Sequence, residues 1–229
     1  MKRFYKAVST AAADHGIAIE LDGRRIRTPK REHLIVPTAA LANAIAAEWE
    51  AQGDEILPGT MPLTGMANAA IDLITPDSAA FAAPLAAYGE SDLLCYRAPE
   101  ADLAAAEAEA WNPILAWSEG RHGVEFNLVS GIIHQPQPPA TIAALGEALR
   151  THDPFRLAAL SPLITIGGSL VVALALADQA FDSDTLWNAV TFDEIWQERR
   201  WGTDEEALKA RANRHAEWQT ATRFLSLLG

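Results

Sequence analysis

The chain has only one cysteine among its 229 residues, and this scarcity limits its covalent chemistry. Cys95 cannot form an internal disulfide, which is the pattern of a protein kept in a reducing compartment. The residues around it, Leu93, Leu94 and Tyr96, indicate a buried thiol and not a reactive one. One thiol cannot build a thiolate metal cage, and the six histidines show no paired spacing. The sequence therefore predicts no metal site.

Basic residues are also few. Lysine and arginine number 18 against 30 aspartates and glutamates, which gives a net charge of -12. Because nucleic acids and anionic membranes attract positive surfaces, we expect no nucleic acid partner. The one long uncharged run, residues 157–177, is interrupted by Pro162 and by Gly167-Gly168, so we expect no membrane insertion. It predicts a turn over residues 161–168 and a buried helix over residues 169–180.

Motifs for nucleotide binding and nucleophilic catalysis are missing. Gly167-Gly168-Ser169 lacks the lysine of a phosphate-binding loop, and no G-x-G-x-x-G pattern occurs. Acidic pairs such as Asp193-Glu194 are common at helix starts, where carboxylates suit the helix dipole. The sequence shows no motif with the minimum set of groups that a catalysed reaction needs. We therefore predict no catalytic residue and no cofactor, and we predict that the chain is not an enzyme. The alternative that stays open is a small-molecule enzyme using clustered carboxylates.

The amino-terminal part reads as a small sheet followed by a helix. Alternating apolar positions predict strands at residues 3–8, 17–21, 24–28 and 34–36. Asp22-Gly23 is a strong signal for a two-residue hairpin turn. Thr38 is placed to cap a helix whose apolar stripe is Leu41, Ile45 and Trp49, so we expect Trp49 in the core, like Trp111 and Trp117.

From residue 61 onward, helical patterns dominate. Thr64 is a predicted helix cap, Pro113 is expected to kink or divide its helix, and Pro139 suits the first turn of a helix through Arg150. Thr203 and Glu206 form a predicted capping box for the terminal helix. The predicted fold class is α+β, with a small β-rich amino-terminal domain at 1–60 and a larger all-helical domain at 61–229.

Residues 187–206 mix apolar anchors and charge most densely, because three of the seven tryptophans lie there among acids. If the segment is a helix that stops at Gly202, one side carries Val190, Glu194, Gln197, Glu198 and Trp201. Glu194 then has two interpretations. It is a half-solvated acid paired with a basic side chain, or it is an acid held out for a protein partner. The pattern alone leaves both open.

Eight short motifs in one order resemble a known family. The chain is similar to the F1-ATPase assembly chaperones that act on the alpha subunit of ATP synthase. The matching motifs are R-F-Y-K at 3–6, L-D-G-R-R-I-R-T-P at 21–29, V-P-T with A-x-E-W-x-x-Q at 36–52, M-P-L-T at 61–64, D-L-L-C-Y-R at 92–97, W-N-P-I-L-A-W at 111–117, G-G-S-L at 167–170 and D-E-I-W-Q-E-R-R-W-G-x-D at 193–204.

The resemblance implies a two-domain chaperone without catalysis or bound nucleotide. Such a chaperone binds the unassembled alpha subunit, prevents its aggregation and hands it over to the beta subunit. A functional acidic position of the family falls on Glu194, with Asp193, Gln197 and Trp201 as the neighbouring candidates for partner binding. We expect a monomer when the chain is free. A permanent structural or regulatory subunit would instead need a larger and drier interface.

Location follows from the same resemblance. The family occurs in the mitochondrial matrix and in the cytoplasm of some bacteria. Residues 1–8 have no apolar core of signal-peptide length and no long Arg- and Ser-rich character. We therefore expect a bacterial cytoplasmic protein, or a mitochondrial matrix protein in its processed form.

Overall fold

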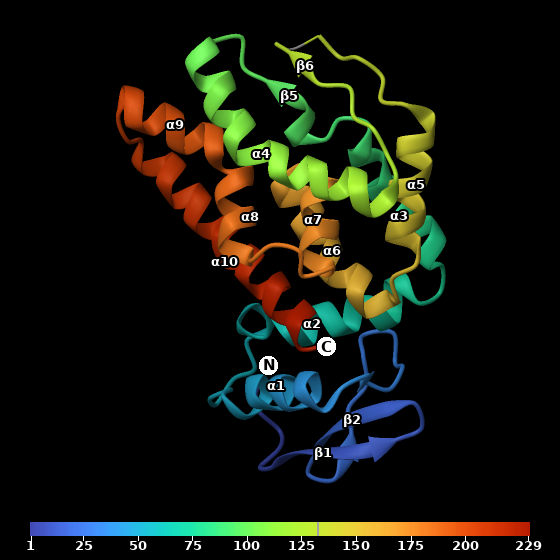
Figure 1. The fold of residues 1–229 in the computed structure, drawn as a ribbon. Helices are drawn as coiled ribbons and strands as arrows, with labels where there is room; N and C mark the ends of the chain where they lie inside the picture. Colours follow the sequence, from blue (N-terminus) through green and yellow to red (C-terminus); the bar gives the residue numbers. More distant parts are fainter. Residues whose placement is uncertain (132) are drawn as a thin grey trace. The chain divides into compact units, whose positions relative to one another are not determined.

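The structure is a computed structural model that describes residues 1–131 and 133–229. Its contacts divide the chain into two compact units, and each is described by itself (Figure 1). Unit 1 comprises residues 1–78, 153–159 and 223–229. Unit 2 comprises residues 79–152 and 160–222.

Unit 1 contains a small antiparallel sheet. Its strands are β1 (Val8–Ala13), β2 (Gly16–Leu21), β3 (Arg24–Arg25) and β4 (Ile35–Val36). β2 is central: β1 pairs with one edge in the register Val8–Leu21, while β3 and β4 pair with successive parts of β2. The predicted hairpin at Asp22-Gly23 is confirmed, and both residues have the positive φ angles that such a turn requires. The first predicted strand was placed too early, because pairing starts at Val8.

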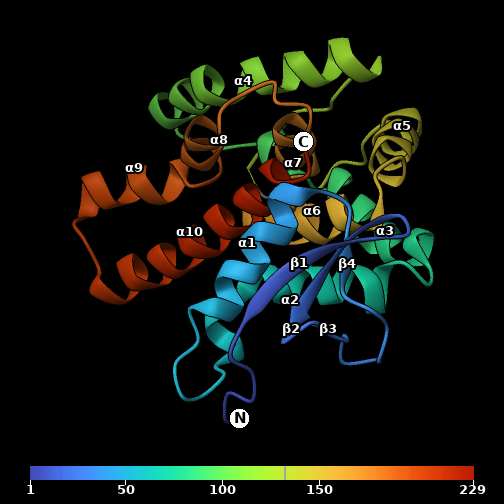
Figure 2. The ribbon, with the colours of Figure 1, turned by 90° about the horizontal axis from the view of Figure 1, so that it is seen from below.

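Helix α1 (Ala39–Glu50) packs on this sheet (Figure 2). Thr38 caps it as predicted, since its hydroxyl accepts a hydrogen bond from the Leu41 amide at 3.2 Å. Leu41 and Ile45 are fully buried, whereas Trp49 is only partly buried beside Tyr5. The prediction of a core position for Trp49 is therefore only half right.

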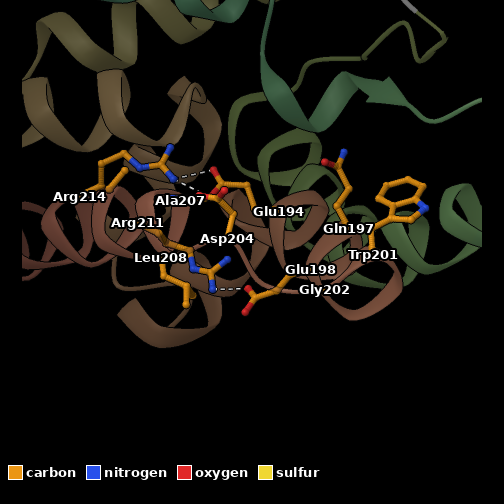
Figure 3. Close-up of a pocket in the computed structure, with 11 residues that line it drawn as sticks. Glu194, Gln197, Glu198, Trp201, Gly202, Asp204, Ala207, Leu208, Arg211 and Arg214 are labelled. Atoms are coloured by element: carbon orange, nitrogen blue, oxygen red, sulfur yellow. Dashed lines mark hydrogen bonds and ion pairs between the residues drawn. The ribbon is translucent and has the colours of Figure 1, made fainter.

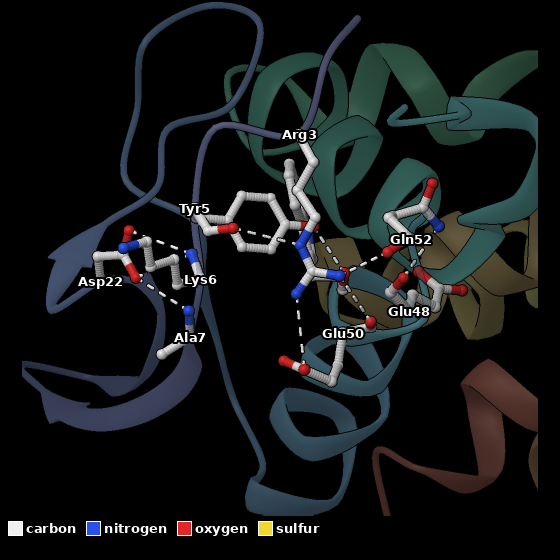
Figure 4. A network of polar contacts seen from close by, with 9 residues as sticks. Arg3, Tyr5, Lys6, Ala7, Asp22, Glu48, Glu50 and Gln52 are labelled. Atoms are coloured by element: carbon white, nitrogen blue, oxygen red, sulfur yellow. Dashed lines mark hydrogen bonds and ion pairs between the residues drawn. The ribbon is translucent and has the colours of Figure 1, made fainter. Parts of the chain in front are cut away.

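Three short helical segments complete this part of unit 1: η1 (Pro58–Thr60), α2 (Pro62–Ala69) and the π-helical turn η2 (Ala70–Ile74). Glu48 of α1 accepts hydrogen bonds from the amides of Leu63 and Thr64 at 2.7 and 2.8 Å (Figure 4 shows the surrounding polar network). Thr64 is therefore not the cap that was predicted. The carboxylate of Glu48 satisfies the free amides at the start of α2 from another helix.

In its described residues, unit 2 consists of helices, connecting loops and two short strands. Its helices are α3 (Ser78–Ala86), α4 (Ala101–His122), α5 (Pro139–Arg150), most of α6 (Pro154–Gly167), α7 (Leu170–Ala177), α8 (Ser183–Val190), α9 (Phe192–Trp201) and most of α10 (Glu205–Ser226), with the 3-10 turns η3 (Ala87–Gly89) and η4 (Leu93–Cys95). Every residue of α7 is buried, and α4, α5 and α8 pack around it. β5 (Tyr96–Arg97) pairs in parallel with β6 (Val129–Ser130).

Two prolines lie inside helices: Pro162, where a turn was predicted, and Pro113, where a kink or a division of the helix was predicted. Pro162 is within α6, so the predicted turn over residues 161–168 is wrong and the helix continues to Gly167. Pro113 is within the unbroken helix α4. A proline removes one backbone hydrogen bond, but the buried residues on either side, such as Leu160 and Leu163, stabilise the helix through packing.

The predicted fold class is confirmed, because short amino-terminal strands precede a long series of helices. The division into domains at residue 60 stays a prediction, since compact units and independently folding domains are different properties. Among the described residues, no helix combines the length and apolar character needed to cross a bilayer.

Candidate functional site

Helices α9 and α10 form a hairpin of helices in unit 2. Asp193 and Glu194 lie in the first turn of α9, and Arg199 and Arg200 lie in its last turn, where each charge suits the helix dipole. Gly202 follows with φ 93°, as the predicted stop requires. The next helix is capped by Asp204, whose carboxylate accepts a hydrogen bond from the Ala207 amide at 2.8 Å. The predicted capping box at Thr203 is therefore wrong by one residue.

Two ion pairs connect the two helices (Figure 3). Arg214 donates to both carboxylate oxygens of Glu194, at 2.7 and 2.6 Å. Arg211 donates to Glu198 at 2.5 Å. The side chains of Glu194 and Arg214 are 41% and 40% exposed. Because solvent screens such an exposed pair, it stabilises the fold by only about 0–1 kcal/mol, which leaves Glu194 able to exchange partners.

A groove of about 560 Å³ follows these pairs, and we call it the α9–α10 groove. Its lining is Glu194, Gln197, Glu198, Trp201, Gly202, Asp204, Ala207, Leu208, Ala210, Arg211 and Arg214. Trp201 is 73% exposed and Leu208 is 37% exposed, which is unusual for large apolar side chains. Within the described chain, the Gln197 side chain makes no recorded hydrogen bond. The groove thus combines exposed apolar area with two glutamates that are each paired with an arginine.

The opposite side of α9 is fixed against α4. Asp193 points there, toward Glu107, with Arg97 close by. Burial, and then the negative charge of Glu107, raise the pKa of Asp193 to about 6. Arg97 lies over the ring of Trp111 at 4.9 Å and donates to Asn112 at 2.8 Å.

Aromatic rings also pack against the side of α9 that faces α4. The buried Trp111 donates its Nε1 proton to the carbonyl of Ala189 at 2.9 Å, and its ring meets Phe192 edge to face at 6.3 Å. Phe192 in turn stacks on Trp196 at 6.3 Å. Trp111 is thus a core residue as predicted, whereas Trp117 is only partly buried. These contacts fix which face of α9 is turned to the groove.

The structure brings together three of the four residues predicted for partner binding. Glu194, Gln197 and Trp201 line the α9–α10 groove, while Asp193 lies on the other side of the helix. The sequence missed Arg214, which follows its partner Glu194 by 20 residues. Its spacing of three from Arg211 was a weak signal of a shared helix face.

Other groups flagged by the sequence are structural. Cys95 is fully buried, and its burial raises the pKa of the thiol. Asp92 is also fully buried, and its carboxylate accepts hydrogen bonds from the amides of Leu94 and Val171 at 3.1 and 3.0 Å. Desolvation raises the pKa of Asp92 to about 6. Over the described residues, no three His, Cys, Asp or Glu side chains gather to hold a metal ion.

Comparisons with known proteins point to one family. The family model of the ATP12 chaperone protein matches residues 2–119. Protein atp12, mitochondrial, of Schizosaccharomyces pombe is 24% identical over 219 residues, which is 90% of this chain and 75% of that protein.

Solved structures extend the likeness to the fold. The crystal structure of Atp12 from Paracoccus denitrificans is 39% identical, with a TM-score of 0.95 over 100% of this chain and 98% of that one. A point mutant of the same protein gives a TM-score of 0.96 with the same coverage. The Atu1473 protein from Agrobacterium tumefaciens is 38% identical, with a TM-score of 0.93 over 100% of this chain and 86% of that one.

Proposed function

Because the chain belongs to the ATP12 chaperone family, we propose that it is an assembly chaperone for ATP synthase. In this proposal it binds the unassembled alpha subunit of the F1 sector, prevents its aggregation and hands it over to the beta subunit. The observation that carries the proposal is the α9–α10 groove, where exposed apolar side chains adjoin the half-exposed Glu194. The chain acts as a binding protein and transforms no substrate.

The physical need for such a protein lies in the client. A subunit that waits for its neighbour exposes an apolar surface larger than a soluble monomer tolerates, and this surface promotes aggregation. A reversible cover removes the hazard. It must bind less tightly than the final neighbour, so an affinity between micromolar and nanomolar, roughly 8 to 12 kcal/mol, is suitable.

In the groove, apolar and polar residues have separate tasks. Trp201 and Leu208 supply exposed apolar area for anchoring, and tryptophan is the residue type most enriched among dominant interface contacts. Glu194 and Gln197 supply specificity, because a matching polar group on the client can replace or extend their present contacts. Asp193 lies on the opposite side of α9, toward Glu107 of α4, and does not line the groove.

The alternative of a small-molecule enzyme finds less support at this site. General acid-base catalysis needs a carboxyl group free to exchange a proton with a substrate. Glu194 and Glu198 are each bound by an arginine, and Asp204 caps a helix. The clustered carboxylates of the groove therefore have structural partners.

The test is suppression of aggregation. Purified alpha subunit is diluted from denaturant, and light scattering is followed with and without the chain in equimolar amount. We expect the chain to keep the alpha subunit soluble in the absence of ATP, and to co-elute with it in size-exclusion chromatography. The beta subunit, diluted in the same way, is the control, and the chain should not reduce its light scattering. Scattering that is unchanged for the alpha subunit would contradict the proposal.

We propose the cytoplasm of a bacterium as its location, or the mitochondrial matrix for a processed form. The free chain is a monomer in this proposal, since the α9–α10 groove must be available to the client. Analytical ultracentrifugation of the purified chain measures this directly. A stable dimer that covers Trp201 would contradict it.

A further inference from the structure

Unit 1 contains a second groove, unrelated to the α9–α10 groove. It has a volume of about 560 Å³ and lies between the first residues of the chain and the β2–β3 hairpin. We call it the amino-terminal groove. Its lining is Met1, Phe4, Tyr5, Leu21, Asp22, Arg24, Arg25, Ile26, Arg27 and Trp49.

The base of this groove is rigid and apolar. Tyr5 and Leu21 belong to a buried cluster with Ile56 and Met61, against which Trp49 packs. The Tyr5 hydroxyl donates to the carbonyl of Trp49 at 2.6 Å and so joins the two sides. A preformed apolar surface of this kind can bind a side chain without first paying the entropy of ordering itself.

The rim exposes large apolar side chains. Phe4 is 65% exposed and Met1 is 72% exposed, although both lie next to buried neighbours. Phe4 meets Tyr5 edge to face at 5.4 Å, so its ring extends the aromatic surface out of the core. Exposed aromatic and methionine side chains beside a concave surface are typical of protein interfaces.

The same rim carries a positive charge that is exceptional for this acidic chain. Three arginines and one aspartate line the groove, in a protein with a net charge of -12. Asp22 is already engaged, because its carboxylate accepts hydrogen bonds from the amides of Lys6 and Ala7 at 3.0 and 2.9 Å (Figure 4). Arg24 is exposed, and its guanidinium interacts electrostatically with the Asp22 carboxylate. With three arginines against one aspartate, the rim keeps an excess of positive charge for a ligand.

The backbone offers a further contact. β3 is two residues long and pairs with β2. Just after it, Ile26 accepts a hydrogen bond from the Leu34 amide, and Arg27 forms a bridge with His33. The free edge is therefore short, and it can add a backbone contact to an extended ligand that side chains hold.

We propose that the amino-terminal groove binds an extended, acidic segment of another polypeptide. An apolar side chain of that segment packs on Phe4, Tyr5 and Trp49, and its carboxylates face Arg24, Arg25 and Arg27. A membrane surface is a poorer match, since the net charge of -12 repels an extended anionic sheet of lipid. A single peptide strand interacts only with the local positive rim.

The probe is a fluorescein-labelled synthetic peptide in which glutamate alternates with leucine, and anisotropy measures its binding to the full chain. Two variants test the groove: Arg24→Glu reverses an exposed charge of the rim, and Phe4→Ser removes exposed apolar area. Each should weaken binding by on the order of tenfold. Lys209→Glu is the matched control, because Lys209 is exposed and lines neither groove. It should bind the peptide as the original chain does.

Two further measurements distinguish this proposal from binding by charge attraction alone. A peptide with lysine in place of glutamate should not bind, and vesicles of phosphatidylglycerol should not compete. The proposal would be overturned if the peptide did not bind, if Lys209→Glu weakened binding as much as Arg24→Glu, or if the vesicles displaced the peptide. No ATP synthase subunit takes part in this experiment, so its outcome is independent of the proposed client.

Discussion

At the scale of single residues, Glu194 combines two properties that are usually alternatives. Its carboxylate is held by both bonds from Arg214, yet its side chain is 41% exposed in a groove with exposed apolar neighbours. An ion pair that adds only about 0–1 kcal/mol to stability costs little to open. Glu194 can therefore be paired in the free chain and still interact with a partner.

Replacing Glu194 with Lys is expected to abolish binding of the alpha subunit without unfolding the chain. The new ammonium group faces Arg214 in a solvated setting, so the free energy of unfolding should fall by no more than about 1 kcal/mol. The measurement is co-elution with the alpha subunit, together with a urea titration of the variant. Loss of the fold in Glu194→Lys would show that Glu194 is a structural residue.

The control exchanges the two charges. In the double variant Glu194→Lys with Arg214→Glu, an ion pair can form again with the opposite orientation. If Glu194 contacts the client, this variant regains stability but not client binding. Recovery of binding would instead mean that the client needs only a well-ordered helix pair, and the role of Glu194 would be to position α10.

Replacing Asp193 with Asn is expected to flatten the pH dependence of stability. Burial and Glu107 raise the pKa of Asp193 from 3.8 to about 6. Between these values the folded chain binds more protons than the unfolded chain, so the free energy of unfolding falls as the pH rises from about 4 to about 6. Two pKa units correspond to ~3 kcal/mol, and partial exposure reduces this to on the order of 1 kcal/mol.

The measurement is the urea midpoint of the original chain and of Asp193→Asn across this pH range. The variant should decline less steeply and be at least as stable as the original chain at pH 7. A residual slope is expected from Asp92, whose pKa is raised to about 6 by its complete burial. An unchanged slope in Asp193→Asn would contradict the assignment.

At the scale of elements, local signals predicted what local chemistry decides. The hairpin turn at Asp22-Gly23, the cap of α1 at Thr38 and the start of α5 at Pro139 were predicted correctly, because each depends on residues next to it in sequence. Pro162 was misleading for the opposite reason. Whether a helix survives a proline depends on packing with distant residues, which no local pattern contains.

The same distinction applies to the candidate site. Helical spacing correctly placed Glu194, Gln197 and Trp201 on one face, since that face is set within α9. The pairing with Arg214 depends on how α10 folds back, and the burial of Asp193 depends on α4. The sequence therefore predicted the groove residues of one helix but not their partners on another.

The β1–β2 hairpin gives a prediction for an element. A Cβ atom at Gly16 would lie 2.5 Å from the carbonyl oxygen of Val36, closer than real side chains approach. Gly16→Ala should therefore separate β2 from β4 and lower the free energy of unfolding by about 1–3 kcal/mol. Gly53→Ala is the control, because a Cβ there meets nothing within 4 Å. Equal urea midpoints for the two variants would contradict this account.

At the scale of the whole molecule, the proposed function requires binding that is selective but temporary. The described chain offers two grooves of similar size with different character. The α9–α10 groove balances its charges in pairs, and the amino-terminal groove has an excess of positive charge. Two separate surfaces of moderate affinity can together hold a partner firmly, and each can be released on its own.

The final prediction concerns release. When purified beta subunit is added to a complex of the chain with the alpha subunit, we expect the chain to be displaced without ATP. The reason is thermodynamic: the proposed handover requires the beta subunit to bind the alpha subunit more tightly than the chain does, so adding beta subunit shifts the equilibrium by mass action. Native mass spectrometry during a titration with beta subunit measures the three species. A stable ternary complex, or release only on addition of ATP, would rule out this handover.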